Sequence, residues 1–302
     1  MSVDILLLAL VDGLSYAGLL FLVALGLTLI FGVMGILNVA HGALYAFGGY
    51  AAATFVGWLM KTGEPPTLAL LAALVAAAAI AGGVIGALLE LGLLRWVQDK
   101  DPVLQLLVTF GAFLMLEDIQ HLIWGSAPYT ASEVVSRLGT IELFGVTYTT
   151  YQLLFIPLVA LVIYGLLQYF LRFTRTGRQI VAVTFNAEVA TALGIHAKRI
   201  RLVTFVVGAI FGALGGALAV PTTSLVPGVG ADMIVLSFSV VATAGLGQIT
   251  GALAAAVIIG LARSLAVYTA PELEVVVPYL IMVLVLLVRP HGLFTVAQAR
   301  KI

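Results

Sequence analysis

A long run without a single charged side chain, Leu68–Leu89, limits what this chain can fold into. About 20 predominantly apolar residues are enough for a helix to cross the hydrocarbon core of a membrane. Strands of a membrane β-barrel would instead show segments of about ten residues in which apolar and polar side chains alternate. The run therefore predicts a membrane-spanning helix.

The composition extends this prediction to the whole chain. Of the 302 residues, 62% are hydrophobic and only 9% are charged, whereas about 25% of the residues of a soluble domain are charged. A soluble globule is therefore excluded, and the apolar residues suffice for at most about nine spans of ~20 residues. We expect an all-α, polytopic membrane helix bundle of eight to nine transmembrane segments, with interrupted or re-entrant helices.

Several classes of function are disfavoured by what the sequence lacks. The net charge is zero, so nothing favours a nucleic-acid partner. There are no cysteines, which excludes disulfides, thiolate metal sites and cysteine nucleophiles. The four histidines lie far apart, and we expect neither a metal site nor a cofactor. The start of the chain, Met1–Asp4, lacks the basic region of a cleavable signal peptide, so the first apolar segment is expected to be a true span.

The seventh apolar segment is longer than one span requires. Met233–Ala262 contains no charge, and its middle, Gly245–Gly251, holds three glycines and two polar residues. We therefore divide it into helices near 233–247 and 250–268, although a single kinked helix would also fit a stretch rich in glycine. Reading apolar runs between charges and turn residues places the segments near 5–32, 38–60, 67–94, 103–125, 151–171, 202–226, 233–268 and 275–289.

The positive-inside rule supports this division. The loop 172–201 carries six basic residues against one acidic residue, Glu188, and is expected to be cytoplasmic. Dividing the seventh segment brings the basic tail to the same side, which makes the N-terminus external and the C-terminus cytoplasmic. Eleven of the fourteen lysines and arginines are then cytoplasmic. The basic residues of the loop and the tail are Arg172, Arg175, Arg178, Lys198, Arg199, Arg201, Arg289, Arg300 and Lys301.

Two interrupted segments indicate a transport pathway. Polar residues and glycines break the first apolar stretch near 32–42 and the seventh near 239–250. Breaks at corresponding places in two halves of a membrane protein are typical of transporter sites, because the freed backbone groups must face a cavity or other protein. Serine and threonine also bond to their own helix, and the residues near 38–41 could instead cap a helix. The predicted pathway residues are Asn38, His41, Ser239, Thr243, Gln248 and Thr250.

Charged residues within or near apolar runs are rare and often functional. Asp12, Glu117, Asp118 and Arg263 could belong to a relay, although for the last three a position at the membrane interface is favoured. His121 lies three and four residues after Asp118 and Glu117, a spacing that could hold a metal, but a solvated helix end explains it better. No cluster has convincing catalytic spacing, so an enzyme is not expected.

The basic loop contains a short helix signal suited to docking. Asn186 can cap a helix, Glu188 favours its positive end, and Gly194 suits the position after its end. Such a helix could lie on lipid head groups or insert into a groove of a partner, and we favour a protein partner because the apolar face is small. The predicted docking residues are Asn186, Ala187, Glu188, Val189, Ala192, Leu193 and Gly194, with Val189, Ala192 and Leu193 on one face.

Four blocks of the sequence carry a resemblance to a known family. They are "GLTLIFGVMGILNVAHGALYAFGG" at 26–49, "GRQIVAVTFNAEVATALGIHAKRIR" at 177–201, "TAGLGQITGALAAAVIIG" at 243–260 and "RPHGLF" at 289–294. In this order and over nearly the whole length, the chain resembles LivH-type permeases of bacterial ABC importers for branched-chain amino acids. Permeases for urea, short-chain amides and aromatic acids are similar, so the substrate stays open at this stage.

The resemblance implies one transmembrane permease domain, 1–302, in the bacterial inner membrane. It implies a second homologous permease subunit, two cytoplasmic ATP-binding subunits and an external substrate-binding protein as partners, besides membrane lipid. It also assigns 186–194 to the coupling helix that docks on an ATPase, within the coupling loop 172–201. "FNAEVA" at 185–190 departs from a turn that is frequent in the family, but Asn186 still supplies a cap.

The positions of the lysines agree with ATP hydrolysis by partner subunits. A phosphate-binding P-loop needs lysine directly after glycine, and none of the four lysines follows one. ATP hydrolysis by that route is therefore left to partners. The remaining alternative is a stand-alone channel or facilitator for a small solute, which would use the same glycine breaks but leave the cytoplasmic loop unexplained.

Overall fold

The computed structural model describes residues 3–143 and 145–294, and the chain is helical almost throughout. Seven helices within this part are long and apolar enough to cross a membrane, which confirms the all-α, multi-pass prediction. The longer helices are α1 (Val3–Met34), α2 (His41–Lys61), α3 (Thr67–Leu89), α5 (Pro102–Trp124), α7 (Ile156–Phe173), α10 (Ala197–Ala219) and α12 (Ile249–Thr269). Two shorter apolar helices are α11 (Val229–Ala244) and α13 (Val277–Val288).

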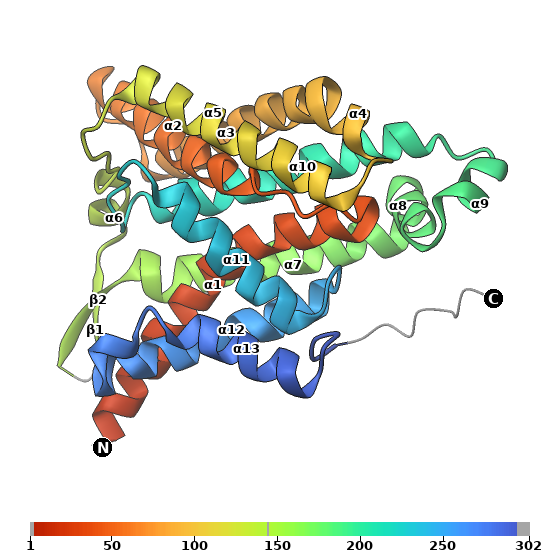
Figure 1. Ribbon diagram of the computed structural model, residues 1–302. Coiled ribbons are helices and arrows are strands. Elements are labelled where there is room, and N and C mark those ends of the chain that lie inside the picture. Colours follow the sequence, from red (N-terminus) through yellow and green to blue (C-terminus); the bar gives the residue numbers. More distant parts are fainter. Residues whose placement is uncertain (1–2, 144, 295–302) are drawn as a thin grey trace.

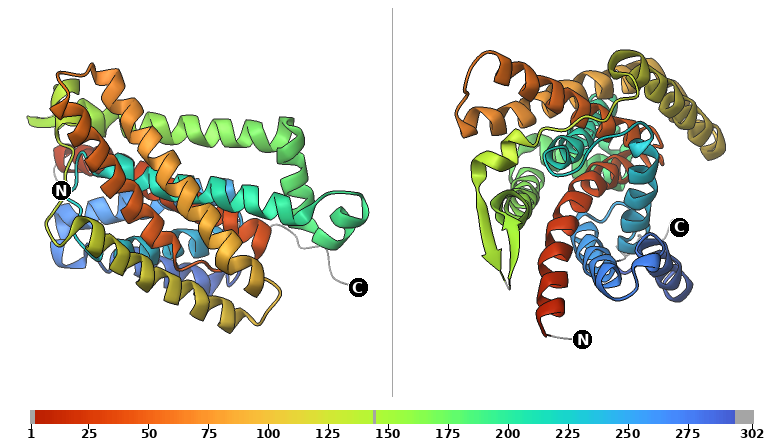
Figure 2. Two further views of the ribbon diagram at one scale, coloured as in Figure 1. Left: turned by 90° about the horizontal axis from the view of Figure 1, so that it is seen from above. Right: turned by 90° about the vertical axis from the view of Figure 1, so that its left-hand side faces the viewer.

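Helices such as α7 and α10 run roughly along one direction (Figure 1) and appear nearly end on in the right panel of Figure 2, where α1 crosses them obliquely. Helix α1 packs against α12 and α10, and α10 also packs against α2 and α3. Most of α1 and α10 is buried, whereas α5 and α7 expose most of their apolar surface. The helices of the central layer are therefore α1 and α10, and the exposed apolar faces of α5 and α7 suit lipid or another membrane subunit.

Small residues let the central helices approach closely. A Cβ atom built on Gly48 of α2 would overlap the carbonyl group of Ala213 in α10, and one built on Gly216 of α10 would overlap that of Tyr45. Membrane helices gain stability from such close packing, because lipid tails are as apolar as the side chains and little hydrophobic driving force remains between helices.

The expected division of the seventh apolar segment is confirmed. Helix α11 ends at Ala244 and α12 begins at Ile249. Gly245 and Gly247 between them have φ angles of +103° and +81°. Side chains larger than hydrogen are strained at such angles, so the two glycines allow the chain to turn here.

Several expected boundaries differ from the structure. The second span begins at His41 rather than near 38, so Asn38 lies in the non-helical link between α1 and α2. The sixth span, expected at 202–226, is α10, which begins at Ala197 and ends at Ala219. The helix begins earlier because it includes the basic residues that precede the apolar stretch. A search for apolar runs stops at such residues and therefore places the start too late.

Short elements connect the spans. Helix α3 continues into the π-helix η1 (Glu90–Leu94) and then into α4 (Arg95–Val97). A second π-helix, η2 (Tyr151–Phe155), precedes α7. The 3-10 helix η3 (Pro271–Leu273) lies between α12 and α13. The loop 126–150, for which the sequence suggested no regular structure, contains α6 (Glu133–Leu138) and a hairpin of β1 (Thr140–Leu143) and β2 (Val146–Thr149). The strands are antiparallel, with Thr140 opposite Thr149.

Different elements lie at the two ends of the bundle. Helices α8 (Arg175–Phe185) and α9 (Ala187–Ala192) project from one end, where α13 also finishes. The hairpin and the start of α1 lie at the other end (Figure 1). Helix α8 was not expected from the sequence, although Thr174 caps it by accepting from the backbone N–H of Gly177 at 3.0 Å. Arg300 and Lys301, which entered the sidedness prediction, lie outside the described residues.

Candidate translocation and coupling sites

The two interrupted segments meet in space. A Cβ atom built on Gly247, in the break between α11 and α12, would lie 3.1 Å from the Cα atom of Gly32, near the end of α1. The segment after α13 joins them, because a Cβ atom on Gly245 would lie 2.9 Å from the carbonyl oxygen of His291. Leu293 and Phe294 donate their backbone N–H groups to the carbonyl groups of residues 243 and 244, at 2.9 Å each. Three breaks in the helical pattern are thus held together at one end of the bundle.

A cavity of about 850 Å³ lies beside this meeting point. Its walls come from the end of α1 and the link after it, the start of α5, α11, the α11–α12 break, and α13 with the residues that follow. The lining residues are predominantly apolar, and Gln248 and His291 are the polar side chains among those described. The lining comprises Phe31, Leu37, Leu106, Phe238, Ala242, Gly245, Leu246, Gln248, Met282, Leu286, Pro290, His291 and Phe294.

Of the predicted pathway residues in the second half, only Gln248 lines this cavity. Ser239 is buried in α11 and donates to the carbonyl oxygen of Leu236 at 2.8 Å. Thr243 is also buried. The hydroxyl oxygen of Thr250 lies 3.2 Å from the Tyr164 hydroxyl of α7, so it joins α12 to α7 instead of facing the cavity. The structure therefore brings the predicted segment to the cavity, with most of its polar side chains directed elsewhere.

The two predicted pathway residues of the first half are buried among the central helices. The side-chain oxygen of Asn38 accepts from the backbone N–H of Ala40 at 3.2 Å. His41 Nε2 donates to the carbonyl oxygen of Val23 at 2.9 Å. Within residues 3–143 and 145–294, Nδ2 of Asn38 and Nδ1 of His41 have no hydrogen-bond partner. Neither residue lines the large cavity.

Sequence reasoning missed the apolar walls of the cavity, such as Phe238 and Met282. In a chain with 62% hydrophobic residues, apolar side chains that line a cavity are not distinguishable by pattern from those that face lipid or the core. The only available signal was the "RPHGLF" block at 289–294, whose residues 290, 291 and 294 lie in the wall.

The predicted docking helix has the expected local structure. The side-chain oxygen of Asn186 accepts from the backbone N–H of Val189 at 3.0 Å and caps α9. At the other end Gly194 has φ +86° and donates to Thr191, while Ile195 donates to Ala190 at 3.0 Å. These two bonds form a Schellman motif, the standard glycine-terminated helix end. Both caps anticipated from the sequence are therefore confirmed.

Helix α9 is fixed on one face and free on the other. Ala190 is buried, but Val189 and Leu193 expose 55% and 78% of their surface. Together with Ala192 they form a small exposed apolar patch on one face of the helix, and contiguous apolar patches of this kind are where partners bind. They can contact a partner without any rearrangement of the helix.

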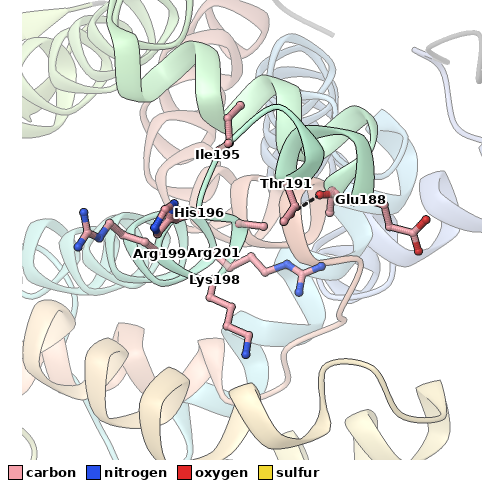
Figure 3. Close-up of a pocket in the computed structure, with 10 residues that line it drawn as sticks. Glu188, Thr191, Ile195, His196, Lys198, Arg199 and Arg201 are labelled. Carbon is pink, nitrogen blue, oxygen red and sulfur yellow. Dashed lines mark hydrogen bonds between the residues drawn. The ribbon is translucent and has the colours of Figure 1, made fainter.

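A pocket of about 840 Å³ separates α9 from the start of α10. Figure 3 shows Glu188 and Thr191 on the α9 side and Lys198, Arg199 and Arg201 along α10. The basic residues around this pocket belong to the basic cluster of the loop 172–201.

Two of the charged residues singled out in the sequence, Arg263 and Asp12, have structural partners at the opposite end. Arg263 forms an ion pair with Glu274 and lies 4.1 Å from the ring centre of Tyr16. Tyr268 donates to a carboxylate oxygen of Asp12 at 2.5 Å. Among the described residues, no group of three or more histidine or acidic side chains could hold a metal, the segment 117–121 included.

These features define a class of protein: a polytopic α-helical membrane protein in which broken helices meet beside a cavity. The chain matches the family described as "Branched-chain amino acid transport system / permease component" over residues 9–286. It belongs to this family of transport permeases.

Individual relatives align over nearly their full length. The high-affinity branched-chain amino acid transport system permease protein LivH of Salmonella typhimurium is 28% identical, with 96% of both chains covered. The corresponding protein BraD of Pseudomonas aeruginosa is 27% identical, with 97% of both covered. The solved structure of PsaBC from Streptococcus pneumoniae in complex with Fab aligns with a TM-score of 0.48 at 12% identity, covering 96% of this chain and 92% of that chain.

Proposed function

We propose that this chain is the permease subunit of an ABC importer that carries branched-chain, hydrophobic amino acids across the bacterial inner membrane. The named relatives support this substrate class. The coupling to a separate ATPase rests on one observation in particular, the doubly capped helix α9 with its exposed apolar face.

The proposed assembly contains a second homologous permease, two cytoplasmic ATP-binding subunits and an external substrate-binding protein. The ATP-binding subunits would receive α9 in a groove, with Val189, Ala192 and Leu193 as the apolar contacts. The second permease would cover part of the apolar surface of α5, which is exposed along most of its length. This subunit itself would perform no catalysis.

The proposed mechanism is alternating access. Closure of the ATPase pair moves α9, and because α9 is joined through Ile195 and His196 to the start of α10, the motion enters the central layer of the bundle. Helix α10 packs on α1, which ends where the breaks meet. The α1–α2 and α11–α12 breaks would then open alternately to the two sides, with Asn38, His41, Ser239, Thr243, Gln248 and Thr250 contributing to the moving region.

The proposed orientation follows the basic residues. The end that carries α8 and α9 holds Arg172, Arg175, Arg178, Lys198, Arg199 and Arg201. Because cytoplasmic loops are enriched in lysine and arginine, this end would face the cytoplasm. The start of α1 would then be external and the end of α13 cytoplasmic.

The test is to extract the tagged chain from its native membrane in mild detergent, identify the co-purifying subunits and reconstitute the assembly in proteoliposomes. We expect two ATP-binding subunits, a second permease and ATP-dependent uptake of leucine, isoleucine and valine in the presence of the binding protein. If the importer takes up urea, amides or aromatic acids in place of these amino acids, the proposed substrate class is wrong. A chain that purifies alone and conducts solute without ATP would be a facilitator and would refute the proposal.

A further inference from the structure

The 850 Å³ cavity at the meeting point of the breaks has the dimensions and lining of a small-molecule site. Such sites usually have volumes of about 300–1,000 Å³ and apolar walls with a few placed polar groups. Phe238 and Ala242 of α11 form one wall, and Met282 and Leu286 of α13 another. The described lining contains no aspartate, glutamate, lysine or arginine, so an apolar group is the part of a ligand that this space accepts best.

The polar groups of the cavity are confined to one place. Gln248 precedes the first residue of α12, and His291 lines the same part of the cavity, since its backbone carbonyl group lies against Gly245 in the break. A ligand with one apolar and one polar end would therefore enter in a single orientation, with its polar end at the α11–α12 break.

The break also offers two opposite partial charges. Helix α11 ends at Ala244 and α12 begins at Ile249. The C-terminal end of a helix is partly negative and the N-terminal end partly positive. Broken membrane helices use such ends to hold charged groups of a substrate. The carbonyl groups of residues 243 and 244 already accept from Leu293 and Phe294, which leaves each of them one lone pair for a further donor. An ammonium group at these oxygens and a carboxylate at the start of α12, as in an α-amino acid, match this pair of ends, whereas a neutral amide would gain less.

From the cavity and its polar edge we infer that this space is a substrate site of the permease itself. It holds the apolar side chain of an α-amino acid between α11 and α13, with the amino and carboxylate groups at the α11–α12 break. This inference rests on the proposed transport function and adds to it a selectivity filter within the membrane subunit.

The absence of cysteine from the sequence allows a direct test of occupancy. In the complete importer, reconstituted in nanodiscs, Ala242→Cys provides a single thiol in the cavity wall of this subunit, and its rate of maleimide labelling is measured with L-leucine, L-glutamate or no addition. We expect leucine to slow the labelling at least fivefold and glutamate to leave it unchanged. The control is Lys100→Cys, an exposed position in the turn before α5, where leucine should have no effect.

A second measurement tests selectivity. Ala242→Phe narrows the cavity and is expected to lower the ratio of leucine to alanine uptake at least fivefold, whereas Ala72→Phe, on the exposed face of α3, should leave the ratio unchanged. Should Ala242→Phe fail to assemble, Met282→Ala must raise the uptake of larger side chains relative to smaller ones.

The outcomes separate two kinds of failure. If the wild-type importer takes up leucine but leucine does not protect Ala242→Cys, or protects Lys100→Cys equally, the site is refuted and the transport function stands. An unchanged uptake ratio in an assembled Ala242→Phe importer refutes the site in the same way. If the wild-type importer takes up no amino acid, the proposed function itself has failed.

Discussion

The imidazole ring of His41 lies directly against Gly212: a Cβ atom built on this glycine would be 2.7 Å from Cε1 of the histidine. The same ring atom also lies close to Gly26 of α1, where a built Cβ atom would again be 2.7 Å from Cε1. With Nε2 bonded to the carbonyl group of Val23, His41 fills a slot between α1 and α10. Its position in the central layer makes it a packing residue as well as a predicted pathway residue.

The tight packing around His41 predicts that one methyl group added at Gly26 lowers the stability of the protein. In Gly26→Ala the new Cβ atom would overlap the carbonyl oxygen of Gly208 and the ring of His41. Because both are held by packed helices, we expect a loss of about 1–3 kcal/mol or more in the free energy of unfolding. The loss is measured as a fall in the midpoint temperature of thermal denaturation of the purified complex, followed by size-exclusion chromatography.

The matched control for that substitution is Gly57→Ala in α2. Apart from its chain neighbours and the backbone of its own helix, no part of residues 3–143 and 145–294 lies within 4 Å of a Cβ atom built there. Alanine favours helix over glycine by up to ~1 kcal/mol, so the stability of this variant should be equal or higher. Equal stability of both variants would contradict the packing argument.

The cap of α9 predicts a local effect. Asn186→Ala removes the acceptor for the backbone N–H of Val189, and loss of such a cap costs about 1 kcal/mol. Amide hydrogen exchange over 187–193 should become faster, while exchange in α10 stays as it was. Asn186→Asp retains an acceptor oxygen and should restore the slow exchange; equal exchange in all three proteins would show that the cap has no effect.

The exposed face of α9 predicts a loss of coupling without a loss of stability. Leu193 exposes 78% of its surface, and substitutions at such sites usually change stability by no more than ~0.5 kcal/mol. Leu193→Asp and Glu188→Arg should nonetheless abolish ATP-driven uptake, because the first places a charge on the apolar contact and the second reverses one beside it. Uptake and ATP hydrolysis are measured in proteoliposomes.

Leu193→Met is the control for this docking surface, since it keeps an apolar side chain of similar volume and should preserve uptake. Normal uptake in both Leu193→Asp and Glu188→Arg would count against α9 as the coupling element.

The ion pair at the opposite end predicts non-additive energies. Arg263 and Glu274 are both about one-third exposed or less, at 28% and 33%. We expect Arg263→Met and Glu274→Gln each to lower the free energy of unfolding by about 1 kcal/mol, and the double variant to lose less than the sum because the two residues interact. Glu272→Gln, an exposed neighbour in η3, should have little effect, and additivity of the first two would show that the pair contributes nothing.

Much of the local structure could be predicted from the sequence. The division of the seventh segment was visible because glycines and polar residues interrupt an otherwise apolar run, and Gly245 and Gly247 indeed turn the chain there. Asn186 and Gly194 signalled the two ends of α9 for a similar reason: caps depend on residues close to one another in the chain. The hairpin over 140–149 was missed because its strands have only four residues each, although both alternate between polar and apolar side chains.

The amino-acid sequence by itself determined that the chain is a bundle of membrane helices, where its seventh segment breaks, and which basic loop carries the short capped helix that we propose as the docking element. These properties depend on local composition, charge and capping. The tertiary structure alone decided that Gly32 meets Gly247, that Thr250 faces α7, and that Phe238 and Met282 line a cavity. In so apolar a chain, burial, lipid contact and cavity lining require the same side chains, and only the packing of distant helices distinguishes them.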